Sequence, residues 1–160
     1  MFTPVDREVR RALVCDTAFH DTESLLERVA PAVLPWDELN RIGALVQESV
    51  RTSETIERYV LDVWEASEKP QRFGIRLDDV DMDRLLLAGA SARGMSALLR
   101  AARVVAWLDE RQHVTPEDVR LVLPPVLGHR VFFTPVYELR RAEISAALVE
   151  AIMDRVAVPR

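Results

Sequence analysis

The sequence is poor in several residue types, and each shortage excludes a class of protein. Cys15 is the only cysteine among 160 residues, so the chain can form no internal disulfide and lacks the ligands of a structural zinc site. Glycine occurs five times and no long segment alternates apolar and polar residues, so a sheet should not dominate. No apolar run approaches a membrane span and no signal pattern begins the chain. We therefore expect a cytoplasmic protein without membrane insertion.

The sequence also lacks the motifs of an enzyme that works alone. Its net charge of -5 makes it a poor electrostatic match for nucleic acid. There is no G-x-x-x-x-G-K-[ST] loop, no strand ending in paired acids, no Ser/His/Asp order and no metal-ligand cluster. The isolated chain should therefore turn over no ATP, hold no resident cofactor and bind nucleotide weakly or not at all.

The stretch from Ser91 to Glu110 is predicted to be the central helix of the fold. The Ser91 hydroxyl can cap its first free amides, and no proline interrupts the following turns. Apolar residues recur along one side at helical spacing, namely Met95, Leu98, Leu99, Ala102, Val105 and Ala106. Capping and periodicity elsewhere predict an all-α fold, a small bundle of about five to seven helices around this one.

Other segments supply the remaining helices and most of the predicted core. Residues 1–33 form an N-terminal helical segment of uncertain assignment, and residues 34–160 form the main helical domain. A helix from Pro35 should bury Leu39, Ile42, Leu45 and Val46, and one from Thr52 or Ser53 should end near Ser67. The predicted core comprises Leu39, Ile42, Val60, Val63, Leu98, Leu99, Ala102, Val105 and Leu121.

The clearest helix start lies at Thr115, where Pro116 and two acids follow in the first turn. Pro124 and Pro125 should kink or end this helix. His129 comes soon after; a structural role at the helix end is favoured over an anion-binding or basic role, since no nucleophile accompanies it. The polar stretch 68–81 reads as an exposed connection, and its aspartates lack the glycine and glutamate of a calcium loop.

Arg93 is unusual because it places a cation in a first helical turn, where the helix dipole and the free amides favour an anion. This arrangement suits a helix start that binds something negative, although a solvated surface arginine is the simpler alternative.

The run GASARGMSALLRAARVVAWL, followed by HVTPEDVRLVLPPVLGHRV, resembles the C-terminal helical lid of MoxR-type AAA+ ATPases. The resemblance extends from about Leu34 to the end of the sequence. It implies an AAA+ lid-type bundle in which Arg93 is the sensor 2 arginine that reaches the nucleotide phosphates, with Ser91 supporting the helix start. Ala92 stands where the family has proline, which should loosen that start.

Two functions follow as expectations. In the first, the chain is the lid portion of a MoxR-like ATPase with a chaperone-like or complex-assembly role. Its partners are then an AAA+ core, neighbouring subunits and a client or adaptor protein, and ATP and Mg enter only when a core is joined to it. In the second, it is a stand-alone helical module for protein–protein interaction, derived from such a lid. An in-frame P-loop upstream of Met1 in the gene would distinguish them.

Overall fold

Helices account for nearly all regular structure in this protein. The computed structural model describes residues 6–29 and 36–159, apart from the side chain of Trp36, and divides into two units, Met1–Asn40 and Arg41–Arg160. The α-helices of the described residues are α1 Arg7–Cys15, α2 Thr22–Glu27, α3 Leu39–Ser49, α4 Glu54–Glu68, α5 Ala92–Leu108, α6 Pro116–Leu127, α7 Pro135–Glu138 and α8 Arg141–Arg155. Short 3-10 turns lie at η1 Thr17–Phe19, η2 Trp36–Glu38, η3 Pro70–Phe73 and η4 Met82–Arg84. The boundary predicted between residues 33 and 34 stays a prediction.

The first unit consists of short capped helices. Asp6 accepts hydrogen bonds from the amides of Glu8 and Val9 at the start of α1, and Asp21 caps α2 in the same way. Neither helix, nor η1 between them, buries a residue. Local capping therefore defines these helices, and they lack a core of their own.

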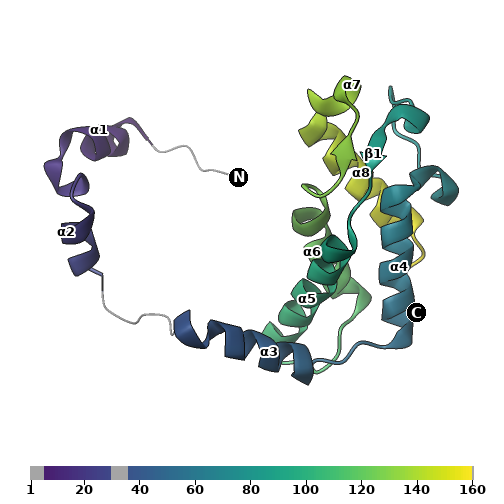
Figure 1. Ribbon diagram of the computed structural model, residues 1–160, viewed down its shortest axis with the longest axis horizontal. Helices are drawn as coiled ribbons and strands as arrows, with labels where there is room; N and C mark the ends of the chain where they lie inside the picture. Colours follow the sequence, from purple (N-terminus) through teal and green to yellow (C-terminus); the bar gives the residue numbers. More distant parts are fainter. Residues whose placement is uncertain (1–5, 30–35, 160) are drawn as a thin grey trace. The chain divides into compact units, whose positions relative to one another are not determined.

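The second unit is a bundle of α4, α5, α6 and α8, which lie side by side in Figure 1. The pairing of α5 with α6 is the most extensive, and α4 packs against α5, α6 and α8. Val63, Leu98, Leu123, Leu148 and Ile152 are fully buried where these helices meet. The predicted all-α fold around the Ser91 helix is therefore confirmed, and no helix in the described ranges is long and apolar enough to span a bilayer.

A small sheet joins the loops at one end of this bundle. Strand β1, Leu86–Ala88, pairs antiparallel with β2, Phe132–Phe133, and Leu86 lies opposite Phe133. The Thr134 amide continues the pairing by donating to the Leu85 carbonyl at 2.9 Å. This sheet fixes the chain that leads into α5 beside the chain that leaves α6.

The predicted core was partly wrong. Val60, Val63, Leu98 and Ala102 are buried as expected, and Ile42, Leu99 and Val105 are half-buried. Leu39, Leu45 and Leu121 are exposed by 50%, 51% and 66%. The buried apolar residues of α6 are instead Val119, Val122, Leu123 and Leu127. The buried face of α6 is therefore rotated away from Leu121.

Three predicted boundaries also need correction. Pro124 and Pro125 do not end α6, which continues to Leu127. Helix α5 stops at Leu108, and Glu110 takes a left-handed backbone with φ 58°. The stretch 68–81 is not merely an exposed connection, because it contains η3 and buries Ile75. The helix start predicted at Pro35 lies outside the described residues.

Candidate functional site

The turn that precedes α5 lies directly on the backbone of α4. A Cβ atom at Gly89 would come within 2.7 Å of both the Cα of Glu68 and the carbonyl oxygen of Ser67. Because both neighbours are backbone atoms, no side-chain adjustment could make room for a larger residue. Glycine at this position therefore permits the close approach that brings the turn onto α4.

Two hydrogen bonds hold the turn in place, and a third orients the Ser67 hydroxyl within α4. The Trp64 indole Nε1 donates to the Ala90 carbonyl at 2.7 Å, and the Ala90 amide donates to the Ser67 hydroxyl at 3.2 Å. The same hydroxyl donates to the Trp64 carbonyl at 2.7 Å. Ser67 is fully buried, so its hydrogen bond with the Ala90 amide is shielded from water. The chain therefore enters α5 from a fixed position on α4.

Ser91 begins α5 as predicted. Its backbone is extended, with φ -75° and ψ 161°, and its hydroxyl accepts a hydrogen bond from the Gly94 amide at 3.3 Å. Ala92 takes the first helical position, so the serine cap defines the helix start without a proline there.

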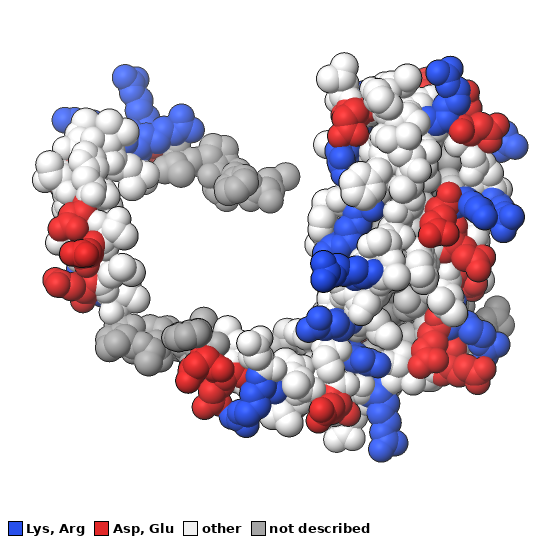
Figure 2. Space-filling view, viewed as in Figure 1, with Lys and Arg blue, Asp and Glu red and all other residues white. Residues whose placement is uncertain are grey.

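Arg93 occupies the second position of α5 and is exposed. No described residue forms a hydrogen bond or an ion pair with its guanidinium group. The first amides of a helix and its dipole create a positive potential, to which Arg93 adds a full charge. Figure 2 shows basic side chains gathered over α5 and α6 on the face in view, with acidic side chains along α4. This end of α5 therefore favours a negatively charged ligand.

Among the other arginines of α5, Arg103 differs from Arg93 because its side chain has hydrogen-bond partners. Arg103 donates from Nε and Nη2 to the Thr52 hydroxyl, at 3.2 and 3.0 Å, and from Nη1 to the Gln47 amide oxygen at 3.4 Å. Gln47 in turn donates to the Arg100 carbonyl at 3.2 Å. Arg103 thus has a structural role, joining α5 to the chain between α3 and α4, while the side chain of Arg100 is exposed.

Arg130 lies beside the start of α5, a position that the sequence alone did not indicate. A Cβ atom at Gly94 would lie 2.9 Å from the Arg130 Cδ atom, so the stem of Arg130 crosses the first turn. His129 contacts the Arg130 guanidinium through Nε2, and no nucleophile accompanies it. The dipeptide His-Arg after a helix does not by itself predict that the arginine packs against the start of another helix.

An ion pair fixes the opposite end of the α5–α6 pair. Asp118 is 3% exposed and accepts hydrogen bonds from Arg111 Nη1 and Nη2, at 2.8 and 2.6 Å, and from the Thr115 amide at 2.8 Å. Burial raises the pKa of the Asp118 carboxyl, but the hydrogen bonds from Arg111 and Thr115 outweigh it and hold that pKa below its usual value. This confirms the helix start predicted at Thr115.

The fold of the second unit is that of a known class of domains. Residues 82–154 match the family described as AAA lid domain, a range that includes the α5 start and the α5–α6 pair. A solved structure described as a putative ATPase from Cytophaga hutchinsonii has the same fold, with a TM-score of 0.64 and 26% identity, over 88% of this chain and 44% of that one.

The sequence relatives are more specific. Protein MoxR of Methylorubrum extorquens is 46% identical over 159 residues, which are 99% of this chain and 46% of that protein. Protein MoxR of Paracoccus denitrificans is 43% identical over 98% of this chain and 46% of its own length. The chain thus contains an AAA lid domain and resembles the MoxR-type AAA+ ATPases, and it spans about half the length of these relatives.

Proposed function

We propose that this chain forms the lid of a MoxR-like AAA+ ATPase and supplies Arg93 to the nucleotide phosphates of the assembled enzyme. One observation carries the proposal: an exposed guanidinium group, without a partner among the described residues, stands at the second position of the 17-residue α5. The start of α5 is tied to α4 through Gly89 and Ala90. Arg93 therefore starts from a rigid base, which limits the entropy lost when it binds an anion.

The residues of this chain fit part of a nucleotide site and no more. Arg93 and the first amides of α5 can bind phosphate oxygens, whereas no group of three or more His, Cys, Asp or Glu side chains in residues 6–29 and 36–159 could hold a metal ion. The phosphate loop and the magnesium ligands must then come from an AAA+ core. ATP bound there would supply the phosphoryl group for transfer.

The guanidinium group of Arg93 can bind two phosphate oxygens at once. The guanidinium group is planar and can donate two parallel hydrogen bonds to two oxygens, which a lysine ammonium group cannot do. Charge spreads over the phosphoryl oxygens as transfer proceeds, so a fixed cation stabilises the transition state more than the ground state. Arg93 should therefore affect turnover more than nucleotide affinity.

A chimera tests this proposal. This chain would replace the aligned segment of the Methylorubrum extorquens MoxR protein, and ATP turnover would be measured for the chimera and three variants. Arg93→Ala should lower turnover at least about tenfold, equivalent to about 1.4 kcal/mol of transition-state stabilisation. Arg93→Lys should recover little of it. Arg100→Ala, an exposed arginine on the same helix, is the matched control and should keep full turnover.

Unfolding measurements must accompany the turnover rates. Arg93→Ala should change the free energy of unfolding by less than about 0.5 kcal/mol, as surface substitutions generally do. Full turnover in Arg93→Ala, or equal losses in Arg93→Ala and Arg100→Ala, would contradict the role proposed for Arg93.

The interaction module remains the second candidate, and exposed apolar side chains favour it. Leu87, Phe132, Val136 and Leu139 lie in β1, β2, α7 and the residue after α7, and each is more than half exposed. Apolar groups gathered in this way commonly mark contact surfaces. With either function the chain would have protein partners, which are neighbouring subunits or clients in a chaperone-like role. An upstream P-loop in the same reading frame favours the lid, and its absence favours the module.

A further inference from the structure

The turn that follows α6 is mounted firmly on α8. The Ser145 hydroxyl donates to the Gly128 carbonyl at 2.6 Å, and Arg141 Nη2 donates to the Val131 carbonyl at 3.2 Å. A Cβ atom at Gly128 would lie 2.9 Å from the Pro124 carbonyl oxygen and 3.3 Å from the Ser145 Oγ, so the turn and α8 are in close contact. The backbone of Arg130 therefore has a fixed position relative to the bundle.

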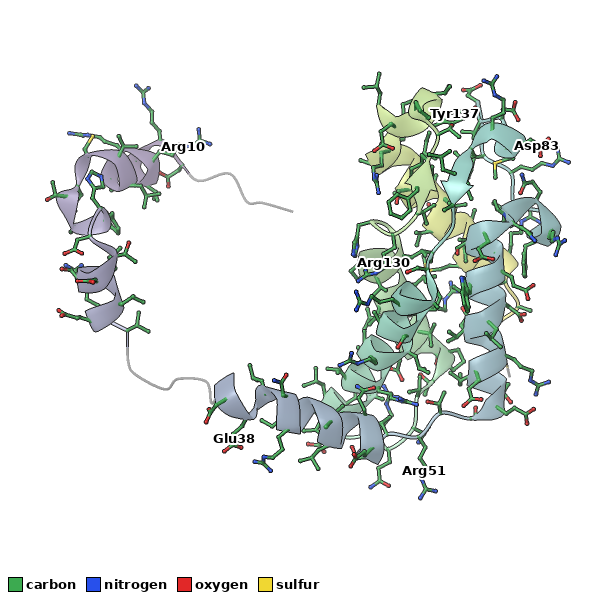
Figure 3. The ribbon with its side chains drawn as sticks, viewed as in Figure 1. Arg10, Glu38, Arg51, Asp83, Arg130 and Tyr137 are labelled. Carbon is green, nitrogen blue, oxygen red and sulfur yellow. The ribbon has the colours of Figure 1, made fainter. Side chains whose placement is uncertain are left out.

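From this turn the Arg130 side chain reaches the start of α5. Its Cδ and Nε atoms lie 2.9 and 3.6 Å from where a Cβ of Gly94 would be. Gly94 is the residue after Arg93, so its missing side chain makes the space that Arg130 fills. Figure 3 shows Arg130 on the side of the body where α5 and α6 lie together. Two arginines that are 37 positions apart are thus gathered at one helix start.

The Arg130 guanidinium is only partly satisfied by its surroundings. Nη1 donates to the Val126 carbonyl at 2.7 Å and contacts His129 Nε2. No described residue accepts a hydrogen bond from Nε or Nη2, which leaves three N–H donors of a half-buried cation. A second positive charge beside the positive end of the α5 dipole is unfavourable unless an anion is bound there.

We propose that Arg130 is a second phosphate-binding residue at the site proposed for Arg93. The two guanidinium groups bind different oxygens of one polyphosphate chain, that of a nucleoside triphosphate. The inference rests on the proposed function, because the phosphate must be presented to this end of α5. It adds a residue that comes from another helix end and depends on the glycine at position 94.

The first test measures binding to the chain itself. Side-chain Nε–H signals of its arginines would be followed by NMR during titration with inorganic triphosphate, with sodium chloride of equal ionic strength as the control. The signals of Arg93 and Arg130 should shift together and saturate with one affinity, while that of Arg100 should not shift. Arg130→Met should weaken the affinity reported by Arg93 at least about fivefold, since hydrogen bonds between charged groups are the stronger class.

Matched variants separate charge from packing. Arg130→Met keeps an unbranched apolar stem over Gly94 and removes only the cation. Gly94→Ala keeps both arginines but displaces Arg130, because the crowded atom belongs to a flexible side chain. In the chimera, both changes should lower kcat/KM for ATP at least about fivefold, and the double variant should be no worse than Arg130→Met. Arg100→Met is the control for loss of an exposed arginine.

The outcomes for the two proposals differ. If Arg93 shifts with triphosphate and Arg130 does not, or if Arg130→Met keeps full kcat/KM, Arg130 is not a phosphate ligand while the role of Arg93 stands. If Arg93 neither shifts nor matters for turnover, the proposed function fails, and the inference about Arg130 fails with it.

Discussion

Removal of the Asp118 carboxylate should destabilise the second unit strongly. Asp118 is 3% exposed and accepts three hydrogen bonds, two from the Arg111 guanidinium and one from the Thr115 amide. Removing one partner of a buried ion pair typically costs about 3–5 kcal/mol. Because the Arg111 side chain is 29% exposed, water can reach its guanidinium after the change. We therefore expect Asp118→Ala to lower the free energy of unfolding by about 3 kcal/mol, at the low end of that range.

Urea unfolding of the chain measures this loss, and Asp109→Ala is the matched control. Asp109 binds the same Arg111 Nη2 at 3.0 Å, but its side chain is 63% exposed. Exposed ion pairs contribute about 0–1 kcal/mol, so Asp109→Ala should change stability by less than about 1 kcal/mol. A loss below about 1 kcal/mol for Asp118→Ala, or the same loss for both variants, would refute the reasoning from burial.

The same carboxylate should make stability depend on pH in acid. The folded-state pKa of Asp118 lies below its unfolded value of about 3.9. Its contribution is therefore complete above the unfolded pKa and is lost as pH falls through the folded pKa. The stability difference between the parent chain and Asp118→Ala should be constant near neutral pH and should shrink below about pH 4. A difference that grows in acid would contradict the assigned direction.

Two further pairs of substitutions test the packing. Gly89→Ala places a Cβ 2.7 Å from the Glu68 backbone and should lower the free energy of unfolding, measured in urea, by about 1–3 kcal/mol. Gly43→Ala is the control, because its Cβ meets nothing within 4 Å, and it should leave stability unchanged or raise it. Leu98→Ala should lower the free energy of unfolding by about 2–5 kcal/mol because Leu98 is fully buried. Leu121→Ala should lower it by less than about 1 kcal/mol because Leu121 is 66% exposed. Equal losses of stability for the two variants would mean that the buried face of α6 is misassigned.

Local signals in the sequence predicted the helix starts well. The caps at Ser91 and Thr115 each join residues three positions apart, so both partners of the hydrogen bond can be recognised in the local sequence. The fold class followed from many such signals in agreement. The phosphate role of Arg93 was inferred from its place in the first turn of α5 and from the motif around it, and it stays a prediction.

Contacts between distant segments could not be predicted in this way. Apolar residues occur at several successive positions of α6. Periodicity alone therefore did not distinguish the face that carries Val119 and Leu123, which is buried, from the face that carries Leu121, which is exposed. For α3, the stripe identified apolar positions but not which of them a neighbour covers, and Leu45 is half exposed. The Gly94–Arg130 contact was missed for the same reason, since a glycine gives no sign of what fills its space.

The hydrogen bond from Trp64 to the turn before α5 gives this protein an internal optical reporter. The indole ring packs against the core and its Nε1 bonds to the carbonyl of Ala90, one residue before the helix cap. Any event that lifts the turn from α4 must break this bond and admit water to the ring. Once Trp36 and Trp107 are replaced by phenylalanine, the emission of Trp64 would then move to longer wavelengths, so strain transmitted through Arg93 to the helix start could be followed by fluorescence without an added label.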